Sequence, residues 1–178
     1  RAVVTYDVEL KDGPSVDGFE PSAEPIDLRV LGRDVLALPE LDEGVPIAIE
    51  LRTGALKTGG ASSFGLGVEQ STTARIAELR EAYFLAGPVE TAEFHVSDGD
   101  DIAGWLGFTA FDPRWVSASM AGARSAIDAW MGRQAPAGTA HALLFQSSNA
   151  RRESKIVVRA APRGAVVSVD PRAPWTAV

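Results

Sequence analysis

The sequence lacks the residues on which several kinds of functional site depend. It has no cysteine, which excludes disulfide bonds, thiolate metal sites and cysteine nucleophiles. Its two histidines, His95 and His141, are too few for a histidine-rich metal site. No apolar run approaches the length of about 18 residues that a membrane-spanning helix needs, so we expect no membrane insertion. We therefore expect a protein that works without a metal or another cofactor.

An excess of positive charge is also missing. The chain of 178 residues carries a net charge of −7, and its isoelectric point is near 4.8. This balance argues against nucleic acid as a partner. The hydrophobic fraction of 46% and the charged fraction of 23% are ordinary for a globular protein. The composition therefore predicts one soluble domain over residues 1–178, and the first residues, RAVVTYDV, predict a strand and not a signal peptide.

The charged residues that are present are sorted along the chain. Residues 1–50 contain twelve Asp or Glu and four Lys or Arg, whereas residues 147–178 contain two acidic and six basic residues. Residues 51–146 are closer to balance, with ten acidic and seven basic residues. An acidic head and a basic tail attract each other, either within one molecule or between neighbouring copies. The sequence leaves both possibilities open.

Alternating apolar and polar residues, the pattern of a strand with one buried face, recur along the chain. They predict strands at 2–10 and 90–96. Further strands are expected at 47–51 and 141–146, with hairpins over 26–38 and 155–170. The first hairpin is expected to turn at Gly32-Arg33 and the second around Pro162-Arg163-Gly164. Residues 102–111 predict a helical turn that continues into a strand.

Two segments show the 3.6-residue period of amphipathic helices. The first covers 72–86 after a Ser71 cap, and its apolar stripe contains Ile76, Leu79 and Tyr83. The second covers 118–133 after a cap at Ser117 or Ser119. Its residues Met120, Ala123, Ile127, Trp130 and Met131 are expected to form a buried stripe.

Segments rich in glycine and proline separate these elements. Residues 53–70 contain five glycines and predict a long Gly/Ser loop, while 11–25 and 160–178 predict extended arms. Strands that cluster in hairpins, together with two helices, predict an α+β fold. The expected architecture is an antiparallel sheet or β-sandwich of about seven strands, with two helices packed on one face.

A short acidic turn is the first candidate site. Ser97–Asp101 places three carboxylates in four residues, at Asp98, Asp100 and Asp101. Calcium takes about six to eight oxygen ligands, and the turn does not match a calcium loop, so helix capping explains it better. His95 shares a strand face with Glu93 and is a candidate general base, although that face is the polar one and both side chains can simply be solvated.

Two Glu-x-Lys-like pairs and one glycine motif are weaker candidates. Glu153-Ser154-Lys155 has the residue types of a metal-dependent nuclease, in which the lysine orients a water, but it lies in a polar turn. Glu50-Leu51-Arg52 lies in a strand, but arginine replaces lysine poorly there. Gly65-Leu66-Gly67 precedes a helix without either glycine-rich phosphate-binding pattern. We interpret these segments as a solvated turn, a strand-edge ion pair and a partner-bound or mobile loop.

Four tryptophans are the remaining candidates. Trp130 lies on the stripe of the second helix and is expected in the core. Trp105 and Trp115 flank a segment with two phenylalanines, which predicts core packing or, second, the wall of a ligand pocket. Trp175 lies in an extended arm with little local core to join, so it is expected to dock on its own domain or on a neighbour.

The polarised charge, the long loop and the extended arms predict a non-enzymatic structural or interaction subunit of an oligomeric assembly, for example a phage tail, neck or injection-tube component in a virion, or a cytoplasmic protein. Further copies or other protein subunits are the expected partners. The candidate interface residues are aromatic or basic: Trp175, Arg172, Arg151, Arg152, Phe64, Lys57 and Trp115. A monomeric protein- or ligand-binding module or chaperone is the alternative. The second alternative is an enzyme with a site around Glu93, His95 and Asp98–Asp101.

Overall fold

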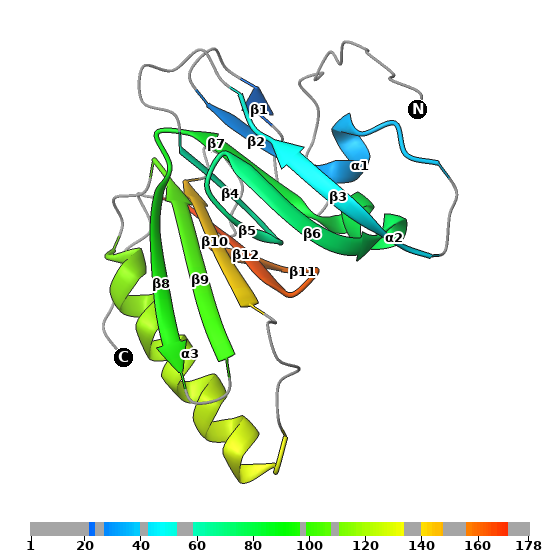
Figure 1. Ribbon diagram of the computed structural model, residues 1–178. Helices are drawn as coiled ribbons and strands as arrows, with labels where there is room; N and C mark the ends of the chain where they lie inside the picture. Colours follow the sequence, from blue (N-terminus) through cyan, green and yellow to red (C-terminus); the bar gives the residue numbers. More distant parts are fainter. Residues whose placement is uncertain are drawn as a thin grey trace.

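A computed structural model of the chain describes residues 22–23, 27–39, 43–52, 59–96, 99–107, 111–133, 140–147 and 156–170. Within these ranges the protein is mixed α and β, with most of its strands in antiparallel pairs (Figure 1). The α+β class predicted from the sequence is confirmed. The strands form three sheets and are more numerous than the seven expected.

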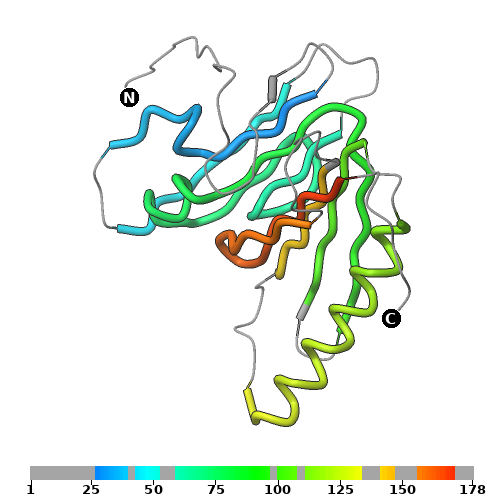
Figure 2. The backbone as a smooth tube through the Cα atoms, turned by 180° about the vertical axis from the view of Figure 1, so that it is seen from behind, coloured from blue at the N-terminus to red at the C-terminus, as the bar shows by residue number. Residues whose placement is uncertain are grey.

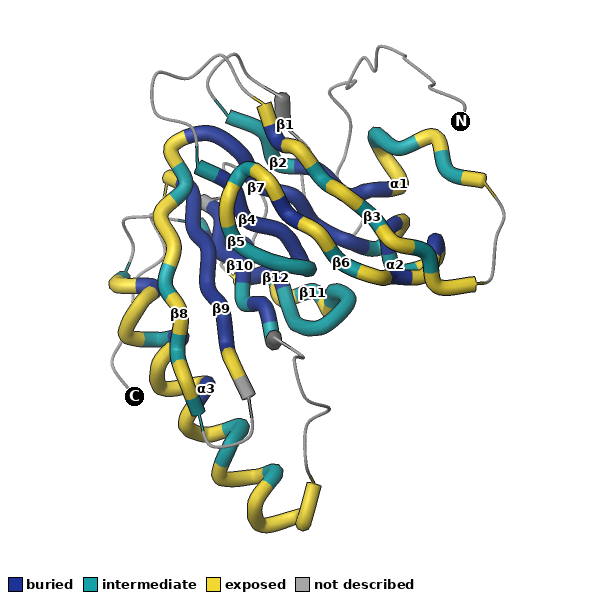
Figure 3. The backbone as a smooth tube through the Cα atoms, in the orientation of Figure 1, coloured by how far each residue is buried: buried dark blue, intermediate teal, exposed yellow. Residues whose placement is uncertain are grey.

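The first sheet has five antiparallel strands. They are β1 (Ser22–Ala23), β2 (Leu28–Leu31), β4 (Gly59–Ser62), β5 (Gly65–Leu66) and β7 (Tyr83–Gly87), in the order β1-β2-β7-β4-β5. We call it the β7 sheet. Every residue of its central strand β7 is buried, because both faces of this sheet are covered by other layers (Figure 3).

The second sheet also has five strands but is mixed. They are β8 (Glu90–Val96), β9 (Gly99–Leu106), β10 (Ala140–Ser147), β11 (Ile156–Ala161) and β12 (Gly164–Val169), in the order β11-β12-β10-β9-β8. We call it the β10 sheet. Strand β10 pairs in parallel with both β9 and β12, so the purely antiparallel sheet expected from the sequence is wrong here. A parallel neighbour requires a crossover connection, and helix α3 (Pro113–Trp130) provides it between β9 and β10.

A third, two-stranded sheet lies beside two short helices. Strands β3 (Gly44–Glu50) and β6 (Glu69–Arg75) pair in antiparallel register, and helices α1 (Gly32–Val35) and α2 (Ile76–Glu81) contact each other nearby. These two helices belong to the layer that covers the β7 sheet, whereas α3 covers the β10 sheet (Figure 2). The sequence predicted helices packed on one face of a sheet. This prediction is wrong, because the helices cover two different sheets.

Three hydrophobic clusters alternate with these layers. One lies between the β7 and β10 sheets and includes Tyr83, Leu85, Leu144 and Val166. Another lies between the β7 sheet and the layer of β3, β6, α1 and α2, and it includes Val30 and Phe84. A third lies under α3 and is built on Trp105, Phe145 and Val167. Successive residues of one strand enter opposite clusters, as the pleat of a β-strand requires.

Glycine permits the closest contact between the two large sheets. A Cβ atom at Gly104 of β9 would lie 2.5 Å from the Cβ of Ala61 on β4. Two non-bonded carbon atoms do not approach so closely, so this crossing of the sheets requires the absence of a side chain at that position. Tyr83 and Gln146 meet in the same interior, where the phenol donates a hydrogen bond to the Gln146 side-chain oxygen. Burial raises the pKa of the Tyr83 phenol.

The Gly/Ser segment expected as a loop contains two short strands and the start of a third. Residues 53–58 lie outside the described residues, but 59–70 form β4, β5 and the start of β6. Its small residues are needed for backbone contacts, because a Cβ at Gly60 would lie 2.6 Å from the Gly67 carbonyl oxygen. The Ser62 hydroxyl is buried and donates to the Gln70 side chain at 2.5 Å. The small residues of 59–70, which in the sequence favour a partner-bound or mobile loop, thus form short strands joined by hydrogen-bonded turns.

Two other predicted elements also differ. Residues 72–75 belong to β6, the helix begins only at Ile76, and 83–87 form β7. The N-cap is Arg75, whose backbone N–H donates to the Glu78 carboxylate at 2.8 Å, and not Ser71. The hairpin expected at Gly32-Arg33 is the start of α1. Gly32 is needed there because a Cβ would lie 1.8 Å from the Leu79 carbonyl oxygen.

Several predicted strands match well. Strand β8 covers the expected 90–96, β3 includes all of the expected 47–51 except Leu51, and β10 includes 141–146. The hairpin of β11 and β12 turns at Pro162-Arg163, where Arg163 has φ of 61°. The first predicted strand, most of the arm 11–25 and residues 171–178 of the second arm lie outside the described residues.

Candidate interaction surface on helix α3

Helix α3 has clear start and stop signals. The Asp112 side chain caps it by accepting a hydrogen bond from the Arg114 backbone N–H at 2.9 Å, and Pro113 occupies the first turn. Gly132 follows the last turn with φ of 65°, the left-handed conformation that commonly ends a helix. The helix is 18 residues long, which corresponds to about 27 Å. It starts five residues earlier than the sequence pattern suggested.

A charged cluster and small side chains attach α3 to the β10 sheet. The Arg124 guanidinium binds both Asp101 carboxylate oxygens, at 2.7 and 3.2 Å, and also binds Asp128 at 3.1 Å. All three side chains are mostly buried. The residues that face the sheet most closely are Pro113, Ser117 and Ala121. Small residues and a bidentate ion pair thus fix which side of the helix meets the sheet.

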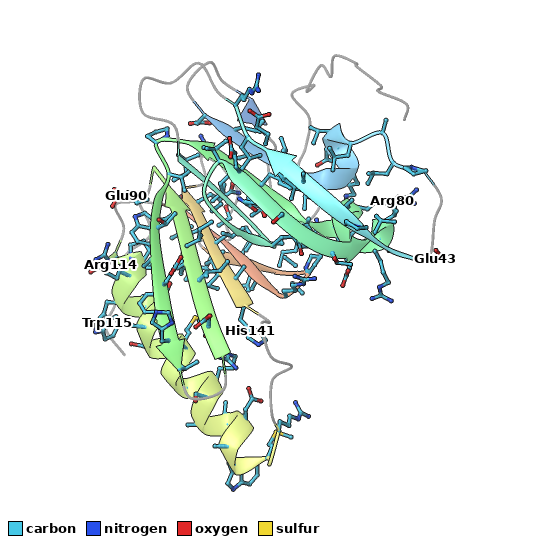
Figure 4. All side chains as sticks on the ribbon, in the orientation of Figure 1. Glu43, Arg80, Glu90, Arg114, Trp115 and His141 are labelled. Carbon is cyan, nitrogen blue, oxygen red and sulfur yellow. The ribbon has the colours of Figure 1, made fainter. Side chains whose placement is uncertain are left out.

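The large apolar side chains of α3 are exposed. The exposed fraction is 70% for Trp115, 50% for Met120, 55% for Ile127, 87% for Trp130 and 47% for Met131. Figure 4 shows Trp115 on the outer side of the helix, and Figure 3 shows how much of α3 is exposed. The sequence-based expectation that this stripe is buried is therefore wrong. We call these five residues, together with Ala123, the apolar face of α3.

The apolar face carries no charged side chain. Between Arg114 and Arg133 the only charged residues are Arg124 and Asp128, and they pair with each other on the side of the helix that meets the sheet, where Arg124 also binds Asp101. At about 100° per residue, the apolar face occupies about half of the helix circumference. Contiguous exposed apolar patches of this kind mark interaction sites in soluble proteins.

Other exposed apolar residues lie on strand β11. Ile156 and Val158 are 48% and 64% exposed, and they pair with Val169 and Val167 of β12. Val167 and Val169 belong to the cluster under α3, so Ile156 and Val158 are on the face of the β10 sheet that carries the helix. Helix α3 packs mainly on β8 and β9. Strand β11 is therefore separated from it by β10 and β12, which corresponds to about 14 Å from β9.

The acidic turn does not gather its carboxylates at one point. Asp101 points under α3 and binds Arg124, whereas Asp100 binds His95 on the neighbouring strand, with 2.7 Å between the carboxylate oxygen and Nδ1. This hydrogen bond raises the pKa of His95, and the charge of Asp100 adds to the effect. Both side chains are largely exposed. Asp98 lies outside the described residues, within which no cluster of three or more potential metal ligands occurs.

The nuclease-like pair in the described residues is a simple ion pair. The Arg52 guanidinium binds the Glu50 carboxylate at 2.5 Å in a local, exposed ion pair, as the simpler interpretation predicted. Glu153 and Lys155 lie outside the described residues. His141 pairs with Asp101 across parallel strands near the start of β10 (Figure 4). Of the described residues among them, Glu50 lies in β3 and His141 in β10, which belong to different sheets.

The predicted interface residues fall into two groups. Trp115 is exposed on α3. Phe64 is half-buried in the turn after β4, and the Arg163 guanidinium lies 5.4 Å from the centre of its ring, a cation–π contact within the molecule. Five others lie outside the described residues: Trp175, Arg172, Arg151, Arg152 and Lys57. Trp105, in contrast, is buried under α3, as core packing predicted.

Ion pairs join segments of both charged ends to the rest of the molecule. Arg159 of β11 binds Glu81 of α2 at 2.7 Å, and Glu81 also binds Arg33 of α1 at 3.5 Å. Asp27 binds the nearby Arg29 at 3.2 Å. The basic C-terminal hairpin is thus attached to the layer of α1 and α2 within one copy. Most charged residues of the head and tail lie outside the described ranges.

No protein-family model matches the chain, and no curated protein sequence matches it. The fold is similar to part of a solved structure, the aminopeptidase N family protein from Idiomarina loihiensis, with a TM-score of 0.66 and 11% sequence identity. The match covers 85% of this chain and 26% of that chain. This chain therefore corresponds to about a quarter of the larger protein, and the likeness concerns the fold. In the described ranges, the helices are too short or too polar to cross a membrane.

Proposed function

We propose that the chain is a non-enzymatic protein-interaction domain of an oligomeric or multidomain assembly, and that the apolar face of α3 is its docking surface. The observation that carries the proposal is the exposure of Trp115 and Trp130 on one uncharged helix face. Aromatic residues in such a setting are typical anchors of protein interfaces. A tail, neck or injection-tube component of a phage is one concrete form, and it depends on the charge sorting and the arms.

The energy available at this face is large enough to matter. A tryptophan has on the order of 200 Å² of surface to bury, so the exposed parts of Trp115 and Trp130 together offer on the order of 300 Å². At about 25 cal/mol per Å², covering them contributes on the order of 8 kcal/mol before the costs of association. Two tryptophans exposed to water contribute none of this energy, whereas a partner that covers them gains it.

A second candidate is an accessory domain that packs beside a catalytic domain. It is favoured by the likeness to about a quarter of an aminopeptidase N family protein. In this case the apolar face of α3 would contact another domain of the same polypeptide or of a partner subunit, and catalysis would belong to that other domain. Both candidates assign the same docking surface, so one experiment tests it.

The test is site-specific photo-crosslinking in cells that produce the protein. A photo-reactive amino acid replaces Ala123 on the apolar face, or Thr91 on β8 as a control; both positions are exposed. Thr91 pairs with Gly104, whose missing side chain would point to the other sheet, so it lies on the face of the β10 sheet without α3. We expect a covalent protein adduct from position 123 alone, and we expect Ala126→Glu to suppress it. Equal adducts from both positions, or none, would contradict the proposal.

A further inference from the structure

We infer that the partner on the apolar face of α3 is a second copy of this chain, and that the two α3 helices pack antiparallel about a twofold axis near Gly122 and Ala123. This inference depends on the proposed function, because it names the occupant of the same surface. Three properties of the surface carry it: its lack of charge, its area and its symmetry of residue sizes.

Charge restricts where identical copies can meet. Each copy carries a net charge of −7, so two copies repel each other unless they meet at a neutral surface. The apolar face of α3 is such a surface, because Arg124 and Asp128 turn toward the sheet and pair there. This face offers no opposite charge to bind a strongly acidic or basic partner. It also carries no like charge that would repel an identical face.

The exposed area is sufficient for a weak dimer. The four tryptophans of two copies expose on the order of 600 Å². Met120 and Ile127 lie roughly 140–160° around the helix from Gly122, at about 100° per residue, so a contact centred on Gly122 leaves them uncovered. The area of the tryptophans alone is below the roughly 1,000 Å² expected of a stable interface and corresponds to a weak, transient one. We therefore expect a weak association, on the order of 100 μM.

The order of residue sizes along α3 is self-complementary. Trp115, Ser119, Gly122, Ala126 and Trp130 recur every three or four residues, so they form one stripe with large ends and a small centre. In an antiparallel pair centred on Gly122 and Ala123, Trp115 of each copy lies opposite Trp130 of the other, and Ser119 opposite Ala126. A Cβ at Gly122 would have no atom within 4 Å, so the centre of the stripe is open to a second helix. Such self-matching is what a twofold interface requires.

Sedimentation equilibrium of the full chain from about 5 to 500 μM tests the inference. We expect the apparent mass to rise from 18.8 kDa toward twice that value. Ala126→Glu places a charge at the centre of the contact and should weaken the dimer at least tenfold, with the circular dichroism spectrum and thermal midpoint preserved. Val158→Glu is the matched control, because Val158 is equally apolar and exposed but lies on β11; it should leave the dimer unchanged.

A disulfide test is independent of the affinity. The chain contains no cysteine, so a single Gly122→Cys substitution can form a disulfide only between two copies. A disulfide needs Cα atoms about 4.4–6.8 Å apart, which two helices reach only where they face each other closely. We expect Gly122→Cys to form covalent dimers on mild oxidation and Thr91→Cys, on the opposite face of the sheet, to remain monomeric.

The outcomes separate the two proposals. A strict monomer up to 500 μM, or a dimer that Ala126→Glu leaves intact, overturns the second copy as occupant. If crosslinking at position 123 then captures a different protein, the proposed function stands with another partner. If it captures residues 171–178 of the same molecule, the face is covered from within, and both proposals fail.

Discussion

Replacing Trp130 by alanine tests the exposed orientation of α3 most directly. The periodicity of the sequence places Trp130 in the core, where truncation to alanine costs about 3–5 kcal/mol. The structure leaves 87% of its surface exposed, so only about one eighth is covered. Covering that fraction of a tryptophan stabilises the fold by roughly 0.5–0.8 kcal/mol. We therefore expect Trp130→Ala to lower the unfolding free energy by less than 1 kcal/mol.

Thermal and urea unfolding followed by circular dichroism measure this difference. For a chain of this length, 1 kcal/mol corresponds to about 2–4 °C in Tm, so the expected shift is at most about 3 °C. The matched control is Trp105→Ala, since Trp105 is 6% exposed under α3; it should lower Tm by about 6–20 °C. Measurements at 1 μM keep the protein dissociated. A loss above 2 kcal/mol for Trp130→Ala would refute the orientation of the helix.

Three further predictions concern other parts of the fold. Gly104→Val should destabilise the protein by about 1–3 kcal/mol or more in urea unfolding, because its Cβ would lie 2.5 Å from that of Ala61; a neutral effect would contradict the packing of the two sheets. Gly122→Ala should stabilise the dilute protein by about 0.5–1 kcal/mol, since helix propensity improves and the space is open; a loss of stability would count against it. Asp100→Asn should lower the pKa of His95, measured by NMR titration, because the hydrogen bond that the His95 ring makes to the Asp100 carboxylate raises it. The raised pKa makes this pair stabilise the fold below the ordinary histidine pKa of about 6.5, and that stabilisation is lost as pH rises through the folded-state pKa; an unchanged titration would exclude the pair.

The half-buried strands could be predicted from the sequence because each has one apolar face. Strand β8 alternates Ala92 and Phe94 with exposed Glu93 and His95, and strand β11 alternates exposed and half-buried residues in the same way. Such strands carry their own periodic signal, which is independent of what covers them. The same holds for the break between β11 and β12, where proline and glycine mark the turn.

Strand β7 could not be predicted in this way. Tyr83, Leu85 and Gly87 face one layer while Phe84 and Ala86 face another, so every residue is buried. A continuous apolar run has no period of two, and after the helical turn of α2 it resembles a longer helix. Only the two layers that cover the β7 sheet decide that it is a strand.

The candidate docking surface shows the same limit. The periodicity of Met120, Ile127 and Trp130 predicts an amphipathic helix, and α3 is one, but periodicity alone does not say which face meets the sheet. The bidentate contact of Arg124 with Asp101 and the close approach at Ser117 and Ala121 decide it. Asp101 lies 23 residues from Arg124 in the sequence, so no local pattern reveals their contact.

The sequence by itself determined the α+β class, half-buried strands such as β8, the presence of a helix near 118–130, and the exclusion of disulfides and thiolate chemistry. These follow from composition and from local periodicity, which neighbouring residues set among themselves. The tertiary structure alone decided the parallel pairing of β10, the burial of β7 on both faces and the outward direction of Trp115 and Trp130. Each of these depends on contacts between residues distant in the chain. Those contacts decide which side of a helix or strand is buried, and the remaining side is exposed to solvent.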